Sequence, residues 1–71
     1  MVKAYLLFSD RADKKTKTGF ICQYDKLEID EIINHQREIY FEYCKTTFPL
    51  TKFNVYIIIE KNGCYESFYI I

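Results

Sequence analysis

The chain has 71 residues, with ten basic and ten acidic residues for a formal net charge of zero, and with seven Tyr and six Phe but no Trp. A domain of this size buries only about 60% of its unfolded surface, which leaves little room for an enclosed pocket. Zero net charge excludes a general electrostatic attraction to nucleic acid or to an anionic membrane. The sequence contains neither a membrane-length apolar run nor a signal-peptide pattern, so we expect one cytoplasmic domain over residues 1–71, without a membrane partner.

Two strands joined by a polar loop are predicted at the start of the chain. Residues 2–9 alternate in side-chain direction, and because both resulting faces are largely apolar, we expect an interior strand. Residues 10–18 are charged and lack any period, which indicates an exposed loop. Residues 19–24 resume the alternation, so the two strands should form an antiparallel hairpin.

A helix is predicted over about residues 26–46. Successive residues of an α-helix lie about 100° apart around its axis. This spacing brings six residues into one stripe that should face the sheet: Ile29, Ile32, Ile33, Tyr40, Tyr43 and Cys44. Asp25 and Glu28 have the spacing of a capping box at the start, and Pro49 marks the end. Residues 27–44 carry one basic and five acidic groups, so the helix is the acidic part of the chain.

A second hairpin follows the helix. Residues 52–60 give the strongest strand signal in the chain, and residues 64–71 should run back beside them. Asn62 and Gly63 supply the two positive-φ positions of a type I′ turn, which sets the register of both strands. In that register, one face should lie under the helix with the side chains of Phe53, Val55, Ile57, Ile59, Phe68 and Ile70.

The order strand, strand, helix, strand, strand predicts an α+β fold with two layers, in which one helix packs on one face of a four-stranded sheet. We expect a mixed sheet, with the first strand parallel to one strand of the second hairpin. In element order the chain resembles the β-grasp and the immunoglobulin-binding bacterial domains. That resemblance carries no residue-level motif, so it implies a fold and no functional residue.

The sheet face turned away from the helix is the predicted protein-binding site. A two-layer domain has nothing of its own to cover this face, and contiguous aromatic patches on small proteins usually mark interaction sites. The predicted interface consists of Tyr5, Leu7, Tyr56, Ile58, Tyr65 and Tyr69. Two alternatives stay open: tyrosine favours strands even without a partner, and the same face could close a homodimer sheet against sheet.

The acidic side of the helix is a secondary candidate interface, formed by Glu31, Glu38, Phe41 and Glu42. Carboxylates beside an exposed Phe could bind a basic groove on another protein, such as one that normally holds nucleic acid. The alternative is an ordinary solvated helix face.

No catalytic, metal or cofactor site is predicted. The three cysteines are odd in number and irregular in spacing, which indicates reduced thiols in place of disulfides or a zinc site. His35 has Glu31 and Glu38 beside it on the helix but no nucleophile to activate, and no glycine-rich phosphate loop occurs. We therefore expect a protein that is not an enzyme.

Binding of single-stranded nucleic acid is the alternative function. Aromatic side chains on an open sheet can stack on bases, but such modules also need cations that hold phosphate. The one basic cluster lies within residues 11–17 and is diluted by Asp10 and Asp13. We therefore favour a protein partner over nucleic acid.

The sequence thus predicts a small non-enzymatic module that binds another protein. In size, aromatic content and lack of a catalytic signature, the chain resembles the small accessory proteins with which phages inhibit host machinery, including anti-CRISPR proteins. This resemblance lies in the general make-up of the chain. It implies a viral inhibitor of a host protein complex that acts in the host cytoplasm.

Overall fold

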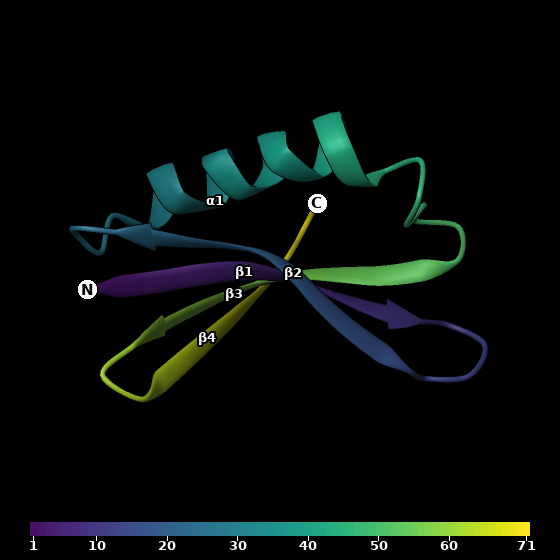
Figure 1. Cartoon of the computed structure of the whole chain (residues 1–71), viewed down its shortest axis with the longest axis horizontal. Helices are drawn as coiled ribbons and strands as arrows, with labels where there is room; N and C mark the ends of the chain where they lie inside the picture. The colour runs from purple at the N-terminus through teal and green to yellow at the C-terminus, as the bar shows by residue number, and fades with distance from the viewer.

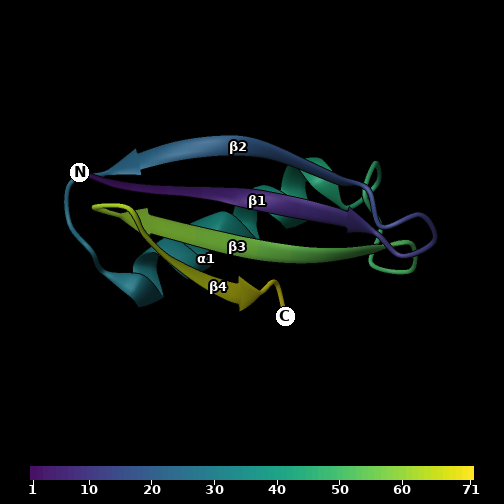
Figure 2. The same ribbon diagram turned by 90° about the horizontal axis from the view of Figure 1, so that it is seen from below.

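The computed structural model describes the whole chain, residues 1–71, as one sheet and one helical layer (Figure 1). The elements in chain order are β1 (Val2–Asp10), β2 (Thr16–Tyr24), α1 (Ile29–Ile39), the π-helical turn η1 (Tyr40–Cys44), β3 (Phe53–Lys61) and β4 (Cys64–Tyr69). The strands lie in the order β2-β1-β3-β4, so β2 and β4 are the edges. The helical layer covers one face, and Figure 2 shows the other face open. The predicted α+β domain, with four strands in one sheet and one helix, is confirmed.

The sheet is antiparallel throughout, so the expected mixed sheet is wrong. β2 ends where Tyr24 pairs with Val2, at the start of β1. The helical layer then carries the chain back along the sheet over more than about 20 Å. β3 therefore begins where Phe53 pairs with Asp10, at the end of β1, and must run in the opposite direction to β1. This strand order does not confirm the likeness to the β-grasp domains.

β2 is longer than predicted and contains a β-bulge. Residues 16–18, predicted as loop, pair with β1, because residues 11–15 are enough to reverse the chain. The register with β1 shifts beside Tyr5, where Phe20 and Ile21 both lie opposite one residue. Phe20 has a φ of 59°, which is uncommon for a bulky side chain and distorts this edge of the sheet.

The second hairpin has the predicted register. Asn62 and Gly63 form the turn with φ values of 52° and 78°, the positive values that a type I′ turn requires. β3 and β4 then pair without interruption up to Tyr56 opposite Tyr69. The alternation of side chains along both strands therefore sorts them onto the two faces of the sheet as expected.

The last strand ends two residues earlier than predicted. The Ile70 amide still donates to the carbonyl oxygen of Val55 at 3.1 Å, and the Ile70 side chain is buried in the core. The Nε of Arg37 on α1 donates to the Ile70 carbonyl oxygen at 2.9 Å. The helix thus holds the end of the chain, which leaves β4 and rises toward the helical layer (Figure 1).

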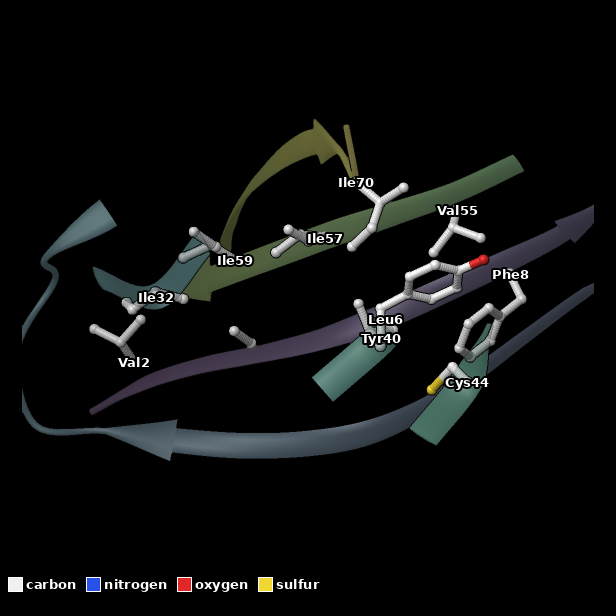
Figure 3. Close-up of a cluster of buried hydrophobic side chains, with 11 residues drawn as sticks. Val2, Leu6, Phe8, Ile32, Tyr40, Cys44, Val55, Ile57, Ile59 and Ile70 are labelled. Carbon is white, nitrogen blue, oxygen red and sulfur yellow. The ribbon is translucent and has the colours of Figure 1, made fainter. Parts of the chain in front are cut away.

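The core lies between the helical layer and the two central strands (Figure 3). The strands contribute the residues that the alternation predicts, among them Val2, Ala4, Leu6, Phe8, Val55, Ile57 and Ile59. The helical layer contributes Ile32, Gln36, Tyr40 and Cys44, which follow one another at intervals of four residues. The core is therefore built from one stripe of the helix against one face of the sheet.

Tyr43 was predicted in the buried stripe, but its side chain is 66% exposed, so this prediction is wrong. Four residues advance an α-helix by about 40° more than a full turn, so a stripe with this spacing drifts around the helix. The wider i→i+5 turn of η1 opposes the drift and keeps Tyr40 and Cys44 in line with the core. Tyr43 is turned outward as a result.

The helix is also shorter than predicted at both ends. It begins at Ile29, and the predicted capping box is wrong, because the N-cap is Glu28 and not Asp25. Past Cys44 the chain forms a turn in which the Tyr40 hydroxyl donates to the carbonyl oxygen of Phe48 at 2.7 Å. Neither α1 nor η1 has the length and apolar character of a membrane-spanning segment.

Candidate functional site

The six predicted interface residues lie together on the open face of the sheet. Cross-strand pairing arranges this face in adjacent rows, because directly opposed residues point to the same side. Read from β1 through β3 to β4, the rows are Leu7-Tyr56-Tyr69, Tyr5-Ile58-Ser67 and Lys3-Glu60-Tyr65. We call the residues of these three rows the open-face patch, and Figure 2 shows the strands that carry it face on.

Exposure of the open-face patch increases toward β4. Ile58 in its centre is only 9% exposed, whereas Tyr65 and Tyr69 on the edge strand are 64% and 69% exposed. The ring of Tyr69 lies against that of Tyr56, with 5.3 Å between their centroids. A partner would therefore meet aromatic surface mainly along β4, while the β1 and β3 residues form a packed base beneath it.

One ion pair lies at the end of the open-face patch. The Lys3 Nζ is 3.7 Å from the Glu60 Oε2, and the two residues face each other across β1 and β3. Burial, together with the nearby Glu60 and Tyr65, raises the pKa of Tyr5, so this hydroxyl stays protonated at neutral pH. The patch thus presents apolar side chains and tyrosine hydroxyl groups, and its two charges are paired with each other.

The secondary candidate lies on the other side of the molecule, on the helical layer. All four of its residues are exposed: Glu31, Glu38, Phe41 and Glu42. The ring of Phe41 packs edge-on against Tyr40, with 5.1 Å between centroids. The protonated carboxyl of Glu31 donates a hydrogen bond to the carboxylate of Glu28, and this bond together with the negative charge of Glu28 raises the pKa of Glu31. Because the sheet separates this surface from the open-face patch, one flat partner surface cannot contact both.

An exposed aromatic pair that the sequence did not indicate joins β2 to the helical layer. Phe20 is 45% exposed and Tyr43 is 66% exposed, and their rings stack with 6.4 Å between centroids. The pair depends on the bulge in β2 and on the π-helical turn η1. Neither irregularity follows from the regular alternation of a strand or the regular period of a helix, so no local sequence signal marks this pair.

A polar network, also not predicted, connects β2 to α1. The Nε2 of Gln36 donates to the Tyr24 hydroxyl at 3.2 Å, and the same hydroxyl is hydrogen-bonded to the Nδ1 of His35 at 2.6 Å. Gln36 is fully buried, and its Oε1 has no hydrogen-bond partner. Burial raises the pKa of Tyr24. The available signal was Gln36 itself, a polar residue inside an apolar stripe that needs a partner when buried.

An open cleft of about 370 Å³ lies beside this network, between the end of β2 and the start of α1. Its lining residues are Tyr24, Asp25, Lys26, Glu28, Glu31, Ile32 and His35. The Nδ1 of His35 is bonded to Tyr24, and none of these residues is a serine, cysteine or threonine that the imidazole could activate. The cleft therefore presents charged side chains around the hydrogen-bonded pair of Tyr24 and His35.

The thiols are separate from one another. Cys44 is buried, and burial raises its pKa, whereas Cys64 is exposed beside the β3–β4 turn. No group of three or more His, Cys, Asp or Glu side chains converges on a point where a metal ion could be held.

Comparison of the chain with protein families, with curated proteins and with solved structures gives no match. The geometry of the open-face patch is therefore the basis for assigning a function.

Proposed function

We propose that the protein is a small non-enzymatic module that binds another protein through the open-face patch. The observation that carries this proposal is the continuity of the three rows, which place six apolar or aromatic side chains side by side on a face that no other element covers. Contiguous patches of this kind with a polar margin are typical of interaction sites. Tyr is well suited to such a site because it combines a large rigid ring with one hydroxyl group.

The chemistry of the patch defines the kind of partner. Its only charges, Lys3 and Glu60, are paired with each other, so a strongly charged partner surface would gain nothing from them. A flat partner surface with apolar side chains and hydrogen-bond acceptors for the hydroxyls of Tyr65 and Tyr69 would fit best. The general make-up of the chain supports a phage-type accessory inhibitor of a host protein complex, located in the host cytoplasm, as the biological setting of this proposal.

Nucleic acid is a weaker candidate for the same face. The Tyr56 and Tyr69 rings could stack on bases, but the one cation within the rows, Lys3, already faces Glu60. A nucleic-acid platform would require free cations around the rings, and binding would weaken steeply as salt rises.

A capture experiment with matched variants tests the proposal. The immobilised protein is compared with Tyr65→Ser/Tyr69→Ser and with the control Tyr43→Ser, which removes an equally exposed tyrosine from the helical side. We expect one host protein to bind the wild type and the control in a fixed ratio, to be lost from the double variant, and to rebind when purified. Equal retention by all three forms would contradict the proposal, and retention of nucleic acid would favour the alternative.

A further inference from the structure

The two edges of the sheet differ in how well they are protected against pairing with another strand. An edge strand carries unpaired backbone groups, and proteins usually block it with a bulge, a proline or lysine side chains. β2 has the bulge at Phe20, with its positive φ, and carries Lys17. This edge is therefore distorted and positively charged.

β4 has none of these protections. It pairs with β3 in one uninterrupted register, contains no proline, lysine or arginine, and has one charged residue, Glu66. Its residues from Cys64 to Ser67 and Tyr69 are exposed. β4 is thus a regular, mostly uncharged edge that is open to a further strand.

The pairing of β4 with β3 determines which backbone groups point outward. In an antiparallel pair, opposed residues alternate between exchanging hydrogen bonds with each other and exchanging none. The amide of Ile70 donates to the carbonyl oxygen of Val55, so this opposed pair is one that exchanges hydrogen bonds. Every second residue from Ile70 back to Cys64 therefore also exchanges hydrogen bonds with β3. The amide and carbonyl groups of the residues between them therefore point away from the sheet: Tyr65, Ser67 and Tyr69.

We propose that this edge pairs with the same edge of a second copy of the chain, antiparallel and with the two-fold axis at Ser67. In this register Ser67 faces Ser67 of the second copy, and Tyr65 faces Tyr69 at each end. All three outward-pointing residues then exchange both of their backbone hydrogen bonds, which gives six bonds across the seam. A shift of the axis by one residue to either side would leave at least one of these groups without a partner from the other β4.

The side chains are compatible with this register. On the open face each end of the seam places one tyrosine opposite another, and aromatic cross-strand pairs stabilise a sheet. On the helical face Glu66 is opposite Phe68 and never opposite its own copy, so no like charges face each other. The sequence of β4 is therefore compatible with its own copy about a two-fold axis, and this favours a second copy over an unrelated strand as the occupant of the edge.

The pairing would also complete the aromatic surface. Tyr65 and Tyr69 are the most exposed rings of the open-face patch, and both lie on β4. Two copies joined at this edge form one eight-stranded sheet, in which four tyrosines gather at the seam. The inference itself rests on the backbone of β4 and does not depend on the proposed function.

Sedimentation of the pure protein over a wide concentration range tests the inference. We expect a dimer whose population falls on dilution. Ser67→Lys should abolish it, because two like charges would meet on the axis, whereas Thr18→Lys on the open face of β2 should leave it unchanged. Ser67→Pro should act like Ser67→Lys, since it removes an outward amide and no bond to β3. A wild type that stays monomeric, or a dimer that survives both changes at Ser67, would overturn the inference.

Cross-linking tests the register independently of these variants. In a background with Cys22→Ser and Cys64→Ser, Ser67→Cys should form a disulfide-linked dimer on mild oxidation, because hydrogen-bonded partners lie about 5.5 Å apart, within the range of a disulfide. Glu66→Cys, which faces Phe68 of the other copy, should not. Equal cross-linking of both variants would mean that the strands do not pair in this register. Because the experiment uses the protein alone, its outcome is distinguishable from a failure to bind another protein.

Discussion

Replacing the buried Gln36 by methionine should stabilise the fold. Gln36 is fully buried, its Oε1 has no partner, and its Nε2 makes one long hydrogen bond of 3.2 Å to Tyr24. An unpaired buried acceptor costs about 1–3 kcal/mol, whereas a neutral hydrogen bond contributes only about 0.5–1.5 kcal/mol. Methionine is unbranched and adapts to irregular spaces, so Gln36→Met keeps the packing and removes both polar groups. Tyr24 keeps its bond to His35.

The expected gain is about 1 kcal/mol in the free energy of unfolding, which corresponds to a rise of about 4–8 °C in melting temperature for a domain of this size. Urea denaturation followed by circular dichroism measures it. Gln36→Glu is the matched control, because it keeps the shape but buries a carboxyl group, and it should destabilise the protein. A loss of about 1 kcal/mol or more in Gln36→Met would contradict this expectation, since it would show that the interactions of Gln36 outweigh the cost of its unpaired Oε1.

Three further predictions address the helical layer. Tyr40→Phe should lower the free energy of unfolding by about 0.5–1.5 kcal/mol, because the partly buried carbonyl oxygen of Phe48 loses its donor, and urea denaturation measures this loss. Burial raises the pKa of Cys44 above its ordinary value of 9.0, so the folded state keeps a proton that the unfolded chain releases, and the contribution of Cys44 to stability should be fully present below pH 9.0 and be lost as the pH rises above it. In Cys44→Ala the free energy of unfolding should fall less between pH 8 and pH 10 than in the wild type; an unchanged slope would contradict this assignment. Glu38→Lys/Glu42→Lys should leave capture of the partner intact if the open-face patch is the interface. Loss of capture with a native circular dichroism spectrum would show that the partner binds the acidic surface of the helical layer instead.

The parts of the fold that depend on neighbouring residues could be predicted from the sequence. The Asn62-Gly63 turn requires positive φ at both positions, and the alternation on either side of it then determines which side chains of β3 and β4 face the core. For the same reason Tyr56, Tyr65 and Tyr69 could be assigned to one face of the sheet before the strand order was known.

The features that were missed depend on contacts between distant segments. The direction of β3 relative to β1 is determined by the end of the sheet at which the helical layer delivers the chain to β3. No local sequence pattern encodes that end. Tyr43 was misplaced because a regular period of about 3.6 residues cannot anticipate the π-helical turn η1. The extra exposure of Tyr65 and Tyr69 relative to Ile58 follows from β4 being an edge strand, which only the strand order reveals.

The most direct test of the proposed function is an amide-resolved NMR titration of the labelled protein with the captured partner. We expect perturbed resonances to gather in the rows of the open-face patch, above all at Tyr65, Ser67 and Tyr69, while the amides of Glu38 and Tyr43 on the helical layer stay unchanged. Perturbations gathered on the helical layer, with β3 and β4 unaffected, would show that the partner does not bind the open-face patch.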